Sequence, residues 1–165
     1  MSGSDWVAIA GVATGGVVTI AVTGLNYWFQ DREARRQAQR ERLSQLRDVL
    51  DSAGGGLSDA ISAAERRVVA QGDELEETGK AFADKLQAIQ LSKNRIAIRL
   101  GNDDSVTEAY SDVVAKVQRV GKNLYDAHGA LDPGSQEKAN GLIDGVRAGQ
   151  LRYLDRAHAV ANRDL

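Results

Sequence analysis

Several residue types that carry chemistry or interrupt helices are scarce in this sequence. It has no cysteine, a single proline, Pro133, and only 5% aromatic residues in a length of 165. The absence of cysteine excludes disulfide bonds, thiol nucleophiles and thiolate metal ligands. The scarcity of proline and of aromatic side chains favours long helices over a β-sheet. The formal net charge of −2 gives no overall bias towards nucleic acid.

Motifs that would indicate catalysis or cofactor binding are also missing. The only histidines are His128 and His158. Asp155 and His158 have the i, i+3 spacing of helical metal sites, but such a site needs a second copy and facing glutamates. The glycine-rich stretch 52–60 lacks the lysine and the preceding strand of a phosphate-binding loop. We therefore predict a protein that is not an enzyme and has no cofactor or metal. Because acidic residues alternate with basic ones, no nucleic-acid partner is expected.

A long uncharged segment, 6–29, follows a short N-terminal stretch, 1–5. As a helix it would be about 36 Å long at about 1.5 Å per residue, enough to cross a hydrocarbon core of about 30 Å. Trp6 at one end and Tyr27 and Trp28 at the other are typical of the aromatic residues at membrane interfaces. A signal peptide would need basic residues in the first stretch, which has none, and a small-residue cleavage site. We therefore predict a retained transmembrane helix.

Arginines are distributed asymmetrically about this segment. No lysine or arginine precedes it, whereas six arginines follow in the charged juxtamembrane helix that we expect at 30–53: Arg32, Arg35, Arg36, Arg40, Arg42 and Arg47. The positive-inside rule then predicts a plasma-membrane protein with its N-terminus outside and its C-terminal domain in the cytoplasm. The first four arginines are candidates for contact with anionic lipid headgroups. A solvated helix face of mixed charge is the alternative, because acidic residues lie among them.

Small residues recur every four positions in the uncharged segment, at Gly11, Gly15, Thr19 and Thr23. This spacing places them on one helix face and matches the small-xxx-small pattern that allows two membrane helices to approach closely. We predict that this face drives homo-oligomerisation within the bilayer. A segment that is simply rich in glycine is the alternative. A polar pore is disfavoured because the segment contains no charged residue.

Three successive glycines, 54–56, are expected to end the juxtamembrane helix and to form a hinge, because each glycine costs a helix about 1 kcal/mol. Beyond them apolar residues recur every seven positions, at Ile61, Val68, Leu75, Phe82, Ile89 and Ile96. A heptad kept over this length predicts a straight helix, 57–100, with a single buried seam, which either runs through Gly72 or kinks there without losing its register.

Two further helices are predicted after Gly101. Ser105 and Glu108 have the spacing of a capping box at the start of a helix over 105–131. Its buried stripe contains Val113, Val117, Val120 and Leu124. Asp132 followed by Pro133 predicts the start of a last helix, 133–163.

The overall expectation is an all-α chain, in which a single N-terminal transmembrane helix continues into a cytoplasmic antiparallel bundle, 57–165. Short loops between long helices favour antiparallel neighbours. The bundle has three helices, or four if the leucine stripe at 43–50 joins it. Alternatively, the heptads pair between chains as a coiled coil.

Two functions fit this architecture. The first is a non-enzymatic membrane protein that self-associates and presents its bundle to a protein partner, or relays a signal. The second is a small oligomeric protein that perturbs the membrane or forms a channel, of the kind encoded by phages or used in phage defence. Composition rich in alanine, glycine and arginine suggests a bacterial source.

Overall fold

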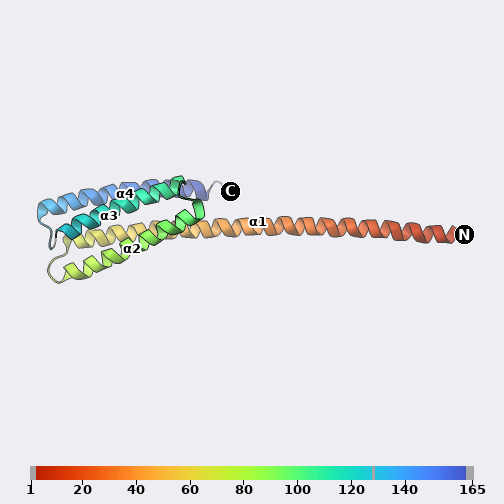
Figure 1. The fold of residues 1–165 in the computed structure, drawn as a ribbon, viewed down its shortest axis with the longest axis horizontal. Coiled ribbons are helices and arrows are strands. Elements are labelled where there is room, and N and C mark those ends of the chain that lie inside the picture. The colour runs from red at the N-terminus through yellow and green to blue at the C-terminus, as the bar shows by residue number, and fades with distance from the viewer. Residues whose placement is uncertain (1–2, 128, 163–165) are drawn as a thin grey trace. The chain divides into compact units, whose positions relative to one another are not determined.

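The computed structural model describes residues 3–127 and 129–162, with side chains described from residue 30 onward. The secondary structure of this part is entirely α-helical. Its helices are α1 (Gly3–Val69), α2 (Glu74–Leu100), α3 (Ser105–Asp126) and α4 (Pro133–Ala161) (Figure 1). The predicted all-α class and the helical bundle are confirmed for the described residues.

The chain divides into two compact units, Met1–Ser44 and Gln45–Leu165. The described part of the first unit is helical throughout and belongs to α1. The second unit contains the remainder of α1 together with the other three helices, and it forms the bundle. The leucine stripe at 43–50 therefore contributes to a bundle of four helices, since Leu50 is buried in its core and Leu46 packs against it.

Successive helices of the bundle run in opposite directions (Figure 1). Between α1 and α2, the Lys85 ammonium lies 2.8 Å from Asp59, and the Arg99 guanidinium lies 3.1 Å from Gln45. The later residue of α2, Arg99, contacts the earlier residue of α1, Gln45. The two helices are therefore antiparallel. The other neighbour of α1 is α4, whose Arg147 pairs with Glu65 of α1. The topology is that of an up-down-up-down bundle.

Aspartate side chains cap the last two helices. Asp132 accepts hydrogen bonds from the backbone N–H groups of Gly134 and Ser135 at 2.9 and 3.0 Å, and Pro133 occupies the first turn, as predicted. At α3 the expected capping box is wrong. The cap residue is Asp104, in an extended conformation, and its carboxylate accepts from the Val106 N–H at 2.8 Å, so that Ser105 is already helical.

The predicted break at Gly54–Gly56 is also wrong, because α1 continues through it. Ala53 and Leu57, on either side of the glycines, are both fully buried. The burial of these neighbours offsets the cost of glycine in a helix, which is only about 1 kcal/mol per residue. The chain turns instead after Val69, where Gly72 has the positive φ of 55° that favours glycine.

The helix predicted over 57–100 is therefore a helical hairpin. Ile61 and Val68 lie on α1, whereas Phe82, Ile89 and Ile96 lie on α2, and all five are buried in the same core. A seven-residue repeat does not by itself distinguish a continuous helix from two helices whose loop preserves the phase. The buried seam is present, but it is shared between two antiparallel helices.

Most residues of the predicted helical core are buried. The exception is Leu75, which is partly exposed at the first turn of α2; the buried ones are Ile61, Val68, Phe82, Ile89, Ile96, Val113, Val117, Val120 and Leu124. Two aromatic residues complete the core. The rings of Tyr110 and Tyr153 meet edge to face with their centroids 5.0 Å apart, and both side chains are fully buried.

Gly54 and Gly55 offer a matched test of this packing. A Cβ atom at residue 55 would meet nothing within 4 Å, so Gly55→Ala should stabilise the bundle by about 1 kcal/mol through helix propensity alone. A Cβ atom at residue 54 would lie 3.1 Å from Leu154 Cδ2, so Gly54→Ala should lose that gain to overpacking. Thermal unfolding of the full chain in mild detergent, followed by circular dichroism, measures both. Equal gains would contradict the close approach of α1 and α4.

Candidate functional site

The arginine-rich segment after residue 29 is the first candidate site. All its side chains from residue 30 to residue 42 are exposed. At about 100° per residue, five of its arginines fall within an arc of about 160° on the helix. These are Arg32, Arg35, Arg36, Arg40 and Arg42, which we call the basic face. Asp31 and Glu33 lie at its borders and Glu41 lies on the other side of the helix. Helical geometry therefore separates charges that alternate in the sequence.

The basic face is open to solvent. Along it, the Arg35 guanidinium forms an ion pair with Asp31 at 2.7 Å, and the two side chains are 80% and 58% exposed. An exposed pair of this kind contributes little to stability, about 0–1 kcal/mol. Arg47, the next arginine along the chain, belongs to the bundle instead, because its guanidinium donates a hydrogen bond to the Ala161 carbonyl at 2.7 Å.

The predicted membrane segment lies within the helical backbone of α1, but its side chains are outside the described ones. This applies to the proposed interface anchors Trp6, Tyr27 and Trp28. It applies equally to the proposed association face, Gly11, Gly15, Thr19 and Thr23. Among the residues open to such a test, no helix has a stretch apolar and long enough to cross a membrane.

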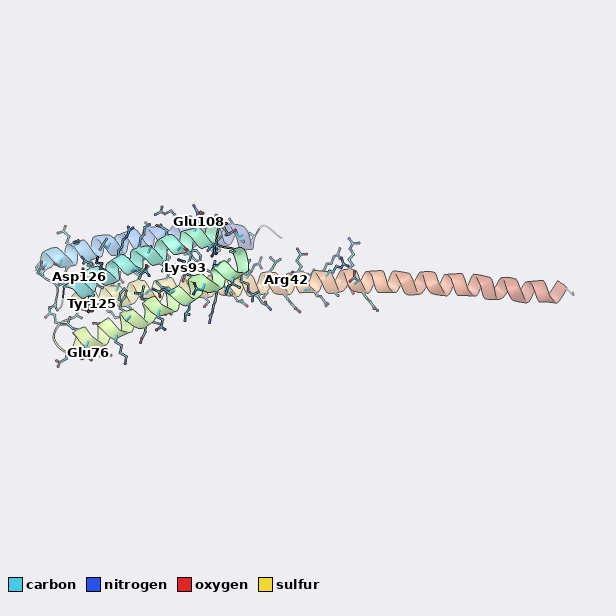
Figure 2. The ribbon with its side chains drawn as sticks, viewed as in Figure 1. Arg42, Glu76, Lys93, Glu108, Tyr125 and Asp126 are labelled. Atoms are coloured by element: carbon cyan, nitrogen blue, oxygen red, sulfur yellow. The ribbon has the colours of Figure 1, made fainter. Side chains whose placement is uncertain are left out.

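An open groove of about 400 Å³ is the second candidate site. It lies between the end of α1, the first half of α2 and the end of α3. Its apolar lining includes Leu75, Phe82, Leu86 and Leu124. Figure 2 shows Glu76 and Tyr125 at this same end of the bundle. We call this site the α2–α3 groove.

Glycine and arginine give the α2–α3 groove its character. A Cβ atom on Gly121 would lie 3.0 Å from the Phe82 ring, so glycine allows α3 to approach α2 closely here. The Arg67 guanidinium donates through Nη2 to the Gly129 carbonyl at 3.2 Å, while its buried Nη1 has no hydrogen-bond partner among the described residues. A buried donor without a partner costs about 1–3 kcal/mol. The groove thus suits an apolar group, with the Arg67 charge beside it.

Heptad analysis did not identify this groove. It assigned Leu75 to the buried seam of one continuous helix. The signal that was available is the pair of glycines, Gly79 and Gly121, at positions where a bundle normally has larger side chains.

The buried tyrosines are the titratable groups most perturbed by the fold. Burial raises the pKa of Tyr110 to about 12. Burial also raises the pKa of Tyr153 well above its usual 10.0, and the neighbouring Tyr110 raises it further. Their hydroxyls point to backbone carbonyls of α1: Tyr153 donates to Leu50 at 2.8 Å, and Tyr110 is 3.5 Å from Ala53. This geometry supports packing rather than proton transfer to a substrate.

Asp155 and His158, the pair with metal-site spacing, are both exposed on α4. Within residues 3–127 and 129–162, no group of three or more histidine, aspartate or glutamate side chains is placed to hold a metal ion.

No protein-family model matches this chain, and neither a curated protein nor a solved structure is found to be similar to it.

The raised tyrosine pKa values predict loss of stability in alkali. The folded state favours the neutral phenols, so their contribution is complete below the ordinary pKa of 10.0 and is lost as the pH rises through about 12. Unfolding free energy measured between these values should fall with pH. The double variant Tyr110→Phe with Tyr153→Phe should show a smaller slope. An unchanged slope would mean that other groups cause the alkaline transition.

Proposed function

We propose that this chain is a non-enzymatic membrane protein that is anchored by segment 6–29 and presents its helical bundle to a protein partner in the cytoplasm. The observation that carries the proposal is the junction near residue 30. There an uncharged segment with aromatic ends gives way to a helix with an exposed basic face.

The basic face supports this orientation. Arginines directly after an apolar segment favour the cytoplasmic side, where anionic lipids attract them by about 1 kcal/mol for each charge near the surface. Arg32, Arg36 and Arg40 lie on successive turns and are all exposed. Since the basic face ends at Arg42 and Arg47 is bound within the bundle, the positive charge is concentrated next to the uncharged segment.

The α2–α3 groove supports a role in protein binding. Its apolar lining matches the anchoring side chain of a partner helix or peptide, and the positive charge of Arg67 in that lining suits a carboxylate of the partner. Lys80 and Glu76 on its rim would align charged residues of the partner. If the protein relays a signal, the affinity of the groove for its partner would depend on whether the anchor segments 6–29 are associated.

Self-association is the remaining part of the proposal. Gly11, Gly15, Thr19 and Thr23 would bring two anchors together through close backbone packing, because there is no hydrophobic driving force between helices in lipid.

Membrane insertion and topology can be tested with single cysteines, since the chain has none of its own. The chain expressed in a bacterium should remain in the membrane fraction after washing with carbonate. A membrane-impermeant maleimide should label Ser4→Cys in intact cells, and Asn162→Cys only after lysis. Recovery of the chain in the soluble fraction would refute the anchor, and labelling of Asn162→Cys in intact cells would reverse the orientation.

The association face predicts that Gly11→Ile with Gly15→Ile reduces oligomerisation in lipid nanodiscs by about tenfold or more, because two bulky side chains prevent close approach of the helices. Single-molecule photobleaching counts the copies in each disc. Ala13→Ile with Val17→Ile, on the other side of the same helix, is the matched control. If both pairs have the same effect, the small residues are not an interface.

A further inference from the structure

Helix α2 has a second stripe, of four apolar and two charged residues, on the side that faces away from the bundle core. Its members recur at alternating intervals of three and four residues, and every one is exposed: Ala81, Asp84, Ala88, Leu91, Arg95 and Ile98. The exposure of Leu91 is 54% and that of Ile98 is 82%. The core of the bundle is already occupied by the other side of the helix, through Phe82, Ile89 and Ile96. This spacing is typical of a coiled-coil seam. Ala81 and Arg95 lie at its border with α1, since they line small grooves together with Ala63 and Asp48 of α1.

We propose that a second copy of the chain covers this stripe, with the two α2 helices antiparallel about a two-fold axis near residues 89 and 90. In this register Ala88 of one copy faces Leu91 of the other, Ala81 faces Ile98, and Asp84 faces Arg95. Each contact occurs twice by symmetry, as in the isologous interfaces of most homodimers.

The order of side chains along the stripe selects the antiparallel arrangement. Each apolar layer then combines an alanine with a large residue, so the layers have equal volume and the helices approach evenly. The charged layer combines an aspartate with an arginine. A parallel pair would instead place Asp84 against Asp84 and Arg95 against Arg95, and like charges that face each other destabilise an interface.

The charges of the stripe are available for this contact. Among the described residues, neither Asp84 nor Arg95 has an ion-pair or hydrogen-bond partner. The basic residues on one border of the stripe are already engaged with α1, since Lys85 pairs with Asp59 and Arg99 with Gln45. The other border carries Lys80 together with the uncharged Gln87 and Asn94. No row of like charges therefore opposes the approach of a second α2.

This interface is independent of the proposed membrane anchor. It uses side chains of the bundle only, and it reverses the direction of one bundle relative to the other. Association through Gly11 and Gly15 alone would not bring residue 81 of one copy to residue 98 of the other, so the two contacts are separable by experiment.

Cysteine cross-linking of the full chain in detergent tests the register directly. Residues 81 and 98 are about 25 Å apart along one helix, at about 1.5 Å per residue. A thiol cross-linker much shorter than this distance cannot join them within a chain. Ala81→Cys with Ile98→Cys should therefore give a cross-linked dimer, whereas each single variant should give none. The matched control is Ala83→Cys with Gln90→Cys, both exposed on α2 but outside the stripe.

A charge exchange in the same cysteine background provides a second measurement. Asp84→Arg or Arg95→Asp alone should reduce cross-linking by about tenfold, since like charges then face each other where Asp84 faced Arg95. Both changes together should restore it. Single-cysteine variants that cross-link as well as the pair would indicate a parallel arrangement and overturn the proposal. Cross-linking no greater than in the control pair, or no recovery in the charge-exchanged chain, would overturn it as well.

Discussion

The packing of two tyrosines against the backbone of α1 is the constraint on which the bundle depends. Tyr153 of α4 donates to the Leu50 carbonyl, Tyr110 of α3 contacts it edge to face, and Leu154 touches Gly54. These contacts join three of the four helices at one level of the core. They require α1 to be helical and to present a surface without a side chain at residue 54. Glycine in the middle of this helix thus creates a close contact between helices and not a hinge.

The two faces of α2 follow from this arrangement. Ile89 and Ile96 of α2 pack into the core formed by the other helices. Leu91 and Ile98 each lie two positions further along, on another side of the helix, and are therefore exposed. At the start of α2, Leu75 reaches only partly into the core because α3 ends near it with Gly121 and Tyr125, which leaves the α2–α3 groove. The buried side of α2 thus contributes to the core, while its exposed stripe and the α2–α3 groove remain at the surface of the bundle.

The features of this structure that point to function lie on its surface. Within the described core, the hydroxyls of Tyr110 and Tyr153 face backbone carbonyls, and Thr107 is also buried. The basic face, the α2–α3 groove and the exposed stripe of α2 lie on separate parts of the chain, and we propose a different contact for each: anionic lipid, an apolar anchor of a partner, and a second copy.

The sequence by itself determined the helical class, the cap at Asp132 and most of the core, because these depend on local propensity and on residue spacing. Heptad positions such as Ile89 and Val113 are buried in any bundle that satisfies the pattern. Only the tertiary structure decided that Gly54–Gly56 remain helical, that the chain reverses at Gly72, and that Asp104 rather than Ser105 caps α3. It also decided that Leu75 borders a groove and that Leu91 and Ile98 form an outer stripe. The physical reason is that a repeat of seven specifies which residues share a helix face, whereas the burial of that face depends on helices distant in the sequence.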